Sequence, residues 1–574
     1  MSCIYSVLIG GKAGEGIKKS AQVIASALMQ QGWFVFQQDD YQSLIKGGHN
    51  FSTVSFSTEP IHNAYVNADL LISFDQRSVE THWLDTLKTP QQSLHCYNSD
   101  ISAEFPDAGT ARLLGFPFLT VAKQLECKPS NISVAAIALF FVWMGWDETL
   151  LEQTVRKAFK RDLDENSRFA KAIWEHGKAA DIRADICLPD ALHSMPRRLL
   201  SGNQAIALGA WTAGLDFYYA YPMTPASSIL HYLALKQTTH KVYAIHAESE
   251  LAAANMAIGS VFAGAKTAIG SSGGGFALMQ EAFSLAGMVE APLLCILSSR
   301  PGPATGVSTY TAQEDLNFAL AQGHGEFGRV VAAPDSITNA FSLSAELLCL
   351  AWEFQSPVIL LCDKHLSESS TCVAKFPEVP FADDYTAIAP KEDVSASYRR
   401  YSQQESGVSP LVFPGLENVT DDVVNKWNSH EHIPSGLRTD KADAIIAMKD
   451  KRSRKMDSLY EATKRYKRIA VYGDGGPLVF AYGSAVMELQ EAKKHCKTDF
   501  RIISLIYLLP FPTAELCQFN ACEAIVVEHN TTGSFAKLLS CELGVVIKKS
   551  ILRYDGRPWD PKELASLLEV SFNA

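Results

Sequence analysis

Five short apolar segments, separated by stretches long enough for helices, most constrain the fold of this chain. They all lie between residues 203 and 373 and read VYAI, KTAIG, PLLCILSS, RVVAAP and SPVILLCD. Strands that alternate with helices along a chain form a parallel sheet with helices on both faces. The sequence therefore predicts a doubly wound α/β domain over residues 203–373.

The same alternation recurs on either side of this segment. Residues 1–185 begin with IYSVLIGG, a glycine-rich turn, an amphipathic helix and WFVF, which predicts a βαβ start. Residues 467–574 contain RIAVYG, RIISLIYLL and AIVVEH. Residues 186–202 read as a linker, and residues 374–466 read as an irregular connecting segment. We predict a multi-domain α/β protein built on doubly wound parallel sheets.

Composition excludes several classes of function. The net charge is −11 and no Lys/Arg run is long enough to override it, which argues against a nucleic-acid-binding protein. The longest apolar run, VAAIALFFVWMGW, is too short for a membrane span and predicts a buried helix. The N-terminus lacks the pattern of a signal peptide, so we expect a cytoplasmic protein. The 12 cysteines form no CxxC pair, so we expect no metal or iron–sulfur site on this chain. His430 and His432 look like metal ligands, but an exposed polar loop is the favoured reading.

Two glycine-rich stretches in residues 1–185 could receive phosphate groups. GGKAGEG lies where a strand gives way to a helix, and backbone amides at such a turn attract anions. It matches neither the Walker A loop nor the dinucleotide fingerprint, and a simple tight turn is the alternative. LIKGGHN adds a lysine and a histidine. The candidate phosphate-binding residues are Gly11, Lys12, Gly14, Gly16, Lys46, Gly47, Gly48 and His49.

Four motifs mark the predicted strand ends of the central domain. YPMTPAS places Thr224 between two prolines, and SSGGG permits close approach of a flat ligand. SSRPGPATGVST carries Arg300, whose fork matches a carboxylate. HAESELAAANMAIGS places Glu248 and Glu250 at the start of a helix, where carboxylates also suit the helix dipole. A further motif, YGDGG, lacks the asparagine of a thiamine diphosphate site and reads as a turn.

Taken in order, YPMTPAS, ESELAAANMAIGS, SSGGGFALM and SRPGPATG…T resemble the pyrimidine-binding α chain of the 2-oxoacid:ferredoxin oxidoreductases. The likeness is greatest to the 2-oxoglutarate type, which HGEFGR also resembles. GGKAGEGI…LIKGGHNFSTVSFS looks like the family's γ domain, fused ahead of the α domain. PFP and VVEHN look like the transketolase C-terminal type of domain. The resemblance covers essentially the whole chain.

The resemblance implies roles for individual residues. Glu250 would contact N1′ of the aminopyrimidine of thiamine diphosphate, and Glu248 would point elsewhere. Thr224 would contact cofactor or substrate, Arg300 would hold the 2-oxo acid's carboxylate, and Thr309 would be a second substrate contact. The cofactor's surroundings would include Tyr221, Pro222, Gly273 and Gly274. The glycine-rich loops would receive coenzyme A, with Lys12, Lys46 and His49 beside its phosphates.

The implied reaction converts 2-oxoglutarate, coenzyme A and oxidised ferredoxin to succinyl-CoA, CO2 and reduced ferredoxin, or runs in reverse to fix CO2. A β subunit would hold the cofactor's diphosphate, Mg²⁺ and a [4Fe-4S] cluster, in an α2β2-type assembly. The same chemistry on pyruvate or a branched 2-oxo acid is the nearest alternative. Two others are a non-catalytic subunit for cofactor docking and assembly, and a non-oxidative thiamine decarboxylase.

Overall fold

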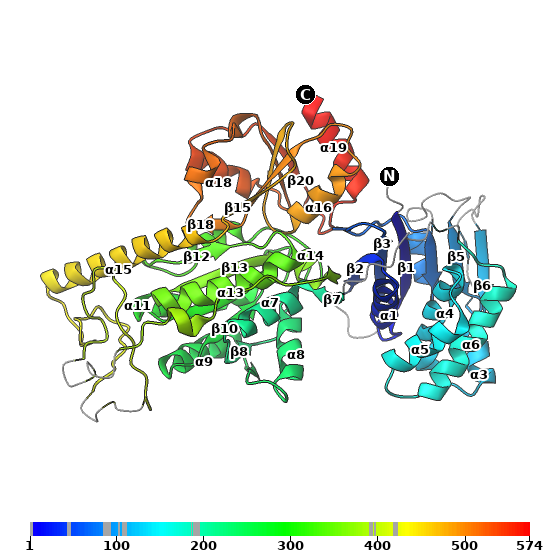
Figure 1. Ribbon diagram of the computed structural model, residues 1–574, viewed down its shortest axis with the longest axis horizontal. Coiled ribbons are helices and arrows are strands. Elements are labelled where there is room, and N and C mark those ends of the chain that lie inside the picture. Colours follow the sequence, from blue (N-terminus) through cyan, green and yellow to red (C-terminus); the bar gives the residue numbers. More distant parts are fainter. Residues whose placement is uncertain are drawn as a thin grey trace. The chain divides into compact units, whose positions relative to one another are not determined.

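The computed structural model describes residues 4–42, 48–83, 93–101, 104–105, 112–184, 186, 196–389, 394, 398–416, 419 and 423–573. The chain forms two compact units. Unit 1 contains residues 1–200, 369–375 and 560–563, and unit 2 contains residues 201–368, 376–559 and 564–574. Three sheets with helices packed against them confirm the multi-domain α/β class (Figure 1).

Unit 1 is built on an eight-stranded sheet of order β6-β5-β4-β1-β3-β2-β14-β7. Its strands are β1 (Ile4–Lys12), β2 (Phe34–Tyr41), β3 (His49–Ser57), β4 (Leu70–Ser73), β5 (Leu94–Asn98), β6 (Arg112–Phe116), β7 (Arg198–Ser201) and β14 (Ser370–Val373). Strands β1, β4, β5 and β6 are parallel, but β3 runs antiparallel between β1 and β2. The predicted βαβ start is therefore a mixed arrangement. Residues 42–48 suffice for an antiparallel return from β2 but not for a parallel crossover.

The helices of unit 1 bury its apolar runs. They are α1 (Ile17–Gln30), α2 (Gln76–His82), α3 (Phe118–Gln124), the 3-10 turn η1 (Pro129–Ser133), α4 (Val134–Trp143), α5 (Glu148–Ala158) and α6 (Leu163–Ala179). Every residue of α4 is buried, which confirms that the longest apolar run forms a core helix. Within the described part of the chain, no helix has the length and apolar character needed to cross a membrane.

Unit 2 contains a seven-stranded sheet of order β18-β12-β13-β11-β10-β8-β9. Its strands are β8 (Phe217–Ala220), β9 (Tyr243–His246), β10 (Thr267–Ser271), β11 (Leu293–Ser299), β12 (Val330–Ala332), β13 (Pro357–Asp363) and β18 (Tyr507–Leu509). The helices around it are α7 (Gly202–Thr212), α8 (Ser227–Lys236), α9 (Glu250–Phe262), α10 (Gly273–Leu278), α11 (Gln280–Met288), α12 (Leu316–Ala321), α13 (Ile337–Phe354) and α14 (Lys364–Glu368). All neighbouring strands are parallel except β18. The five predicted strands of this region are thus all present.

A second sheet of unit 2 has five strands in the order β15-β17-β16-β19-β20. They are β15 (Ile469–Tyr472), β16 (Leu478–Ala481), β17 (Arg501–Leu505), β19 (Ile525–Glu528) and β20 (Lys549–Leu552), with helices α16 (Ser484–Lys493), α17 (Thr513–Leu516), α18 (Ser534–Leu543) and α19 (Pro561–Asn573). Short 3-10 turns are η2 (Ala382–Tyr385), η4 (Thr463–Arg465) and η5 (Ala521–Glu523). The single strand predicted from RIISLIYLL breaks at Ile506 into β17 and β18, which join different sheets.

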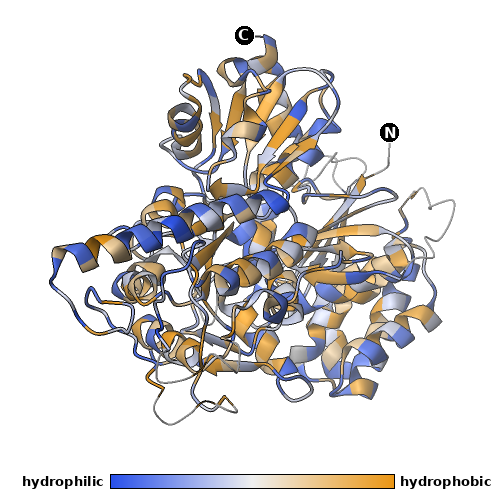
Figure 2. Ribbon diagram, turned by 60° about the vertical axis from the view of Figure 1, so that its left-hand side comes forward, coloured by the Kyte–Doolittle hydropathy of each residue, from blue (hydrophilic) through white to orange (hydrophobic). Residues whose placement is uncertain are grey.

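Part of the segment predicted to be irregular forms the 21-residue helix α15 (Ala442–Ala462). The strands are mostly coloured hydrophobic in Figure 2, whereas α15 is mostly hydrophilic. Its buried residues Met448, Lys451, Lys455 and Leu459 recur at helical spacing and form one face. The sequence did not predict this helix because two of the four positions on its buried face are lysines.

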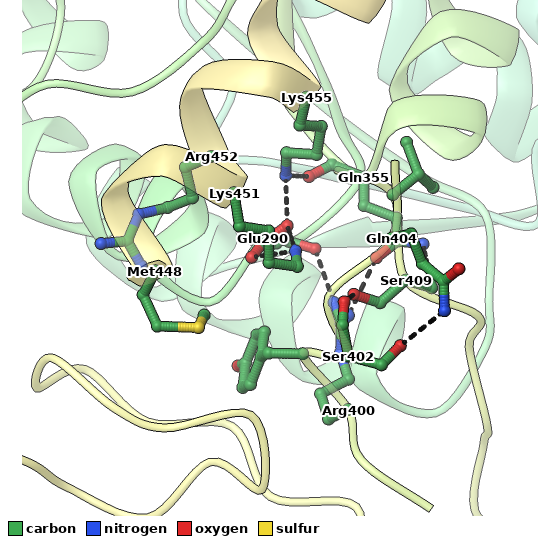
Figure 3. Close-up of polar contacts among 12 residues, drawn as sticks. Glu290, Gln355, Arg400, Ser402, Gln404, Ser409, Met448, Lys451, Arg452 and Lys455 are labelled. Atoms are coloured by element: carbon green, nitrogen blue, oxygen red, sulfur yellow. Dashed lines mark hydrogen bonds and ion pairs between the residues drawn. The ribbon is translucent and has the colours of Figure 1, made fainter. Parts of the chain in front are cut away.

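A buried ionic cluster holds α15 in place (Figure 3). The fully buried carboxylate of Glu290 pairs with Lys451 Nζ at 2.8 Å and Lys455 Nζ at 2.7 Å. Lys455 also donates to the carbonyl of Gln355, and Arg400 donates to the carbonyl of Glu290 at 2.9 Å. Burial opposes ionisation of the Glu290 carboxyl, but Lys451 and Lys455 outweigh it and lower its pKa. The cluster therefore joins α15, the loop after α11 and residues near 400 within unit 2.

Candidate active site

The candidate site lies at the carboxyl ends of four neighbouring parallel strands. Residues 221–224 follow β8, Glu250 opens α9 after β9, residues 272–275 follow β10 and Arg300 follows β11. Carboxyl ends of parallel strands lie at one edge of a sheet, where ligands bind in such folds. The fold thus brings the four sequence motifs to the same edge.

Glu250 and Glu248 have different surroundings. Glu250 is 4% exposed, and Glu248 is exposed. Helix α9 begins at Glu250 because the hydroxyl of Ser249 caps it, accepting a hydrogen bond from the amide of Ala252. No described residue donates a hydrogen bond to the buried Oε1 atom of Glu250. A buried carboxylate oxygen without a partner is costly, and a ligand with a hydrogen-bond donor would relieve that cost.

The carboxylate of Glu250 fits in its position because residue 275 is a glycine, which has no side chain. A Cβ on Gly275 would lie 2.7 Å from Glu250 Oε1 and 2.1 Å from Ser271 Oγ. The adjacent Ser272 is fully buried, and its hydroxyl has no partner among the described residues. The Ser271–Gly275 stretch therefore packs against Glu250 and leaves a second polar atom unsatisfied.

Arg300 is half-buried, and its guanidinium group has a hydrogen-bond donor without a partner among the described residues. Its Nη1 donates to the carbonyl of Thr224 at 2.8 Å, so the two predicted residues meet. Its Nε is buried without a partner, and the group forms no ion pair with any residue that the structure describes. Burial lowers its pKa, against the opposing effect of Asp315. A half-buried cation that forms no ion pair can accept an anionic ligand.

Comparison with known proteins identifies the family. The 2-oxoglutarate synthase subunit KorA of Archaeoglobus fulgidus is 37% identical over 350 residues, which cover 60% of this chain and 90% of that protein. The chain belongs to the 2-oxoacid:ferredoxin oxidoreductase family. The 2-oxoacid:ferredoxin oxidoreductase subunit alpha of a Sulfolobus species is 28% identical over 98% of this chain and 96% of its own length.

Family models and a solved structure support the same assignment. Residues 208–413 match the thiamine-diphosphate-binding model of pyruvate flavodoxin/ferredoxin oxidoreductase, and residues 6–175 match the pyruvate ferredoxin/flavodoxin oxidoreductase model. The 2-oxoglutarate:ferredoxin oxidoreductase of Magnetococcus marinus, solved with 2-oxoglutarate, coenzyme A and succinyl-CoA bound, has a TM-score of 0.87. It is 25% identical, and the match covers 99% of both chains. The chain is thus a fused γ–α subunit of an oxidoreductase family.

The other predicted residues of the strand-end site differ in exposure. Tyr221 is 41% exposed, Pro222 and Gly273 are half-buried, and Gly274 is exposed. Thr309 is buried, at 4% exposure. This arrangement leaves Tyr221 and Gly274 accessible at the strand ends, while Thr309 lies inside the loop that follows Arg300.

In the γ-like unit 1, the first glycine-rich loop is hydrogen-bonded both within itself and to the second loop. The amide of Lys12 donates to Glu15 Oε2 at 2.7 Å, and the amide of Ala13 donates to the carbonyl of Gly48 at 2.8 Å. Gly14 and Gly16 have positive φ angles of 98° and 79°, which glycine adopts without strain. Helix α1 begins after Gly16, whose position provides no side-chain cap.

The second loop lies partly outside the described residues, because Lys46 and Gly47 are not among them. His49 is 6% exposed, and its Nε2 lies 2.8 Å from His82 Nε2. Burial lowers the pKa of His49, so its imidazole favours the neutral form. Lys12 is exposed, whereas the interior position of His49 makes it a weaker candidate for contact with a phosphate.

His430 and His432, the two histidines that look like metal ligands in the sequence, are not both exposed as expected. His430 is exposed, but His432 is fully buried and packs on the ring of Tyr401 at 4.0 Å. The expectation of exposure was therefore wrong for His432. No group of three or more His, Cys, Asp or Glu side chains in the described ranges could hold a metal ion. Asp315 was not predicted as a site residue, because its position before α12 suggests only a helix cap. It accepts a hydrogen bond from Ser299, which directly precedes Arg300.

Proposed function

We propose that this chain is the catalytic γ–α subunit of an enzyme that oxidises 2-oxoglutarate with coenzyme A and ferredoxin, forming succinyl-CoA and CO2. The observation that carries the proposal is a pair of unsatisfied groups at the carboxyl ends of β9 and β11, the two outer strands of the run β11-β10-β8-β9. Glu250 presents a buried carboxylate oxygen without a donor, and Arg300 presents a cation that forms no ion pair with a described residue. One group suits the cofactor and the other suits the 2-oxo acid.

Glu250 fits the aminopyrimidine of thiamine diphosphate. Its orphaned Oε1 can share a proton with N1′ of that ring, and the lack of a side chain on Gly275 leaves the carboxylate uncrowded. When bound, the cofactor supplies the nucleophilic carbon and the electron sink that decarboxylation of a 2-oxo acid requires. Glu250 would hold or move the proton at N1′, and the exposed Glu248 would take no part.

The residues around this ring position would complete the cofactor's surroundings. Tyr221, Pro222 and Thr224 lie on the loop after β8, and Gly273 and Gly274 lie at the start of α10. Glycine at both positions permits the backbone to approach a flat ring. We assign these five residues to the cofactor side of the site.

Arg300 would bind the carboxylate next to the keto group. Its Nε is free for a hydrogen bond while Nη1 is fixed on Thr224, so the guanidinium is already partly oriented. Thr309, buried in the loop after Arg300, would add a second substrate contact. Because any 2-oxo acid has this carboxylate, Arg300 does not select among substrates.

The choice of 2-oxoglutarate follows from the relatives. The 37% identical protein is a 2-oxoglutarate synthase subunit, and the solved relative was determined with 2-oxoglutarate, coenzyme A and succinyl-CoA. The same chemistry on pyruvate or a branched 2-oxo acid remains the alternative, since the first-listed full-length relatives are named only for 2-oxo acids.

Coenzyme A would bind through unit 1. The first amides of α1 and the side chain of Lys12 provide positive potential for its phosphates. Gly11, Gly14, Gly16 and Gly48 shape the loops there. Lys46, Gly47 and His49 complete the proposed set.

A β subunit would supply what this chain lacks. We assign to it the site for the cofactor's diphosphate and Mg²⁺ and a [4Fe-4S] cluster that passes electrons to ferredoxin, in an α2β2-type assembly. The relatives' designation as subunits supports a multi-subunit enzyme. We further propose that residues 1–185, 203–373 and 467–574 are the γ, pyrimidine-binding and transketolase C-terminal-like domains, connected by residues 186–202 and 374–466.

Reduction of a viologen dye by the complex of this chain with its natural partner tests the proposal. The complex is assayed without oxygen, with coenzyme A, on 2-oxoglutarate, pyruvate and 2-oxoisovalerate separately. Coenzyme A-dependent reduction with 2-oxoglutarate alone is expected. A higher rate with another acid would change the substrate, and no reduction from a complex that holds its cofactor and cluster would refute the function.

A further inference from the structure

Asp315 occupies a helix-capping position without capping the helix. It precedes α12 (Leu316–Ala321), where an aspartate side chain ordinarily accepts a hydrogen bond from an amide of the first turn. Here its carboxylate makes no such bond. The side chain turns instead toward the end of β11 and the start of α10, so its role lies outside its own helix.

Two contacts fix the carboxylate at the candidate site. Asp315 Oδ2 accepts a hydrogen bond from the hydroxyl of Ser299 at 2.8 Å, and Ser299 directly precedes Arg300. On the other side, a Cβ on Gly273 would lie 2.5 Å from Asp315 Oδ1, so the carboxylate packs on the backbone of that glycine. Asp315 therefore connects the strand that carries Arg300 with the first residue of α10.

The charges of Asp315 and Arg300 act on each other without direct contact. Burial raises the pKa of the Asp315 carboxyl, as does neighbouring Glu314, while Ser299 and Arg300 oppose them. Asp315 in turn raises the pKa of Arg300 against the effect of burial. No ion pair joins the two side chains, although the structure describes both. The aspartate thus acts on Arg300 electrostatically while forming no ion pair with it.

We propose that Asp315 is a positioning residue that pre-orients Arg300 for the carboxylate of the 2-oxo acid. The inference rests on the proposed function of Arg300. Ser299 and Gly273 hold the aspartate at the end of β11, directly before Arg300, whose Nη1 meets the carbonyl of Thr224. Because Asp315 forms no ion pair with Arg300, the unpartnered Nε of the guanidinium stays available to the substrate. Substrate then binds an arginine that has already lost much of its rotamer freedom.

The variant Asp315→Asn isolates the charge. Its amide oxygen can still accept from Ser299 and its shape still fits against Gly273, so folding is preserved. We expect KM for the 2-oxo acid to rise about five-fold, with kcat within about two-fold of the wild-type value. Asp474→Asn is the matched control, because it makes the same change on an exposed carboxylate in the turn between β15 and β16. KM should not change in this control.

A second measurement does not depend on turnover. Phenylglyoxal labelling of Arg300 in the assembled complex, followed by peptide mass spectrometry, reports how firmly the guanidinium is held. Labelling should be about five-fold faster in Asp315→Asn than in the wild type, and Ser299→Ala should give an intermediate rate. Equal labelling rates, or faster labelling with an unchanged KM, would overturn the inference. A wild-type complex that reduces no dye while the labelling difference persists would refute the proposed function and retain the positioning of Arg300.

Discussion

Replacing Glu250 by glutamine should change activity and stability in opposite directions. The carboxylate is 4% exposed, and its Oε1 has no partner in the described part of the chain. A neutral amide of the same shape is easier to bury than an unpaired carboxylate, by about 1–3 kcal/mol. The protein without cofactor should therefore become more stable by about that amount, which raises Tm by a few degrees.

Activity should fall because glutamine cannot exchange a proton with N1′. Loss of a positioned acid–base group slows an enzyme by about 10²–10⁴-fold, and this range applies to dye reduction by Glu250→Gln. Thermal unfolding is measured on the same purified complex, without cofactor. Glu248→Gln is the control, because Glu248 is exposed two residues away, and stability should stay within about 0.5 kcal/mol of wild type. A Glu250→Gln complex that retained a tenth of its activity, or unfolded at a lower temperature than wild type, would refute the reasoning.

Three further predictions concern the site and α15. Arg300→Lys removes the planar guanidinium and should raise KM for every accepted 2-oxo acid about ten-fold in dye-reduction assays. The affinity for thiamine diphosphate, measured by calorimetry, should not change. A KM equal to that of the wild type would contradict the assignment of Arg300. Gly275→Ala places a methyl group against two side chains and should lower stability by about 1–3 kcal/mol in thermal unfolding. Gly259→Ala, in α9, is the control: nothing lies within 4 Å of its Cβ, so stability should rise by about 0.5–1 kcal/mol. Burial lowers the pKa of Lys455 to about 7. Between pH 7 and about 10 the unfolded chain therefore binds a proton that the folded chain lacks, and the free energy of unfolding should rise with pH. Lys455→Met should flatten that rise in urea titrations at several pH values, and an unchanged slope would show that Lys455 does not titrate as described.

The sequence located the strands of the central domain because their signal is local. Each is an apolar run bounded by turn residues, and β9, β10, β11, β12 and β13 form where expected. It could not predict the partners of β3 or the break at Ile506. Strand pairing depends on which other strand has an unpaired edge, and the local sequence does not show this. β18, for example, pairs with the edge of β12, and β3 pairs with β2.

The sequence likewise predicted some residues of the candidate site and not others. Sequence placed Glu250, Thr224 and Arg300 on strand ends, and the fold brings Arg300 into contact with Thr224. It did not find Asp315, because an aspartate before a short helix has the pattern of an ordinary cap. It also missed α15, since lysine on a buried face contradicts apolar periodicity unless a carboxylate such as Glu290 is already known to lie opposite.

A crystal structure of the complex with thiamine diphosphate and 2-oxoglutarate bound tests the central claim most directly. The account predicts that a carboxylate oxygen of Glu250 lies within about 2.6–3.2 Å of N1′. It also predicts that the Arg300 guanidinium contacts the substrate carboxylate beside the keto group. A cofactor ring contacted by Glu248 instead, or a substrate carboxylate bound away from Arg300, would contradict the account.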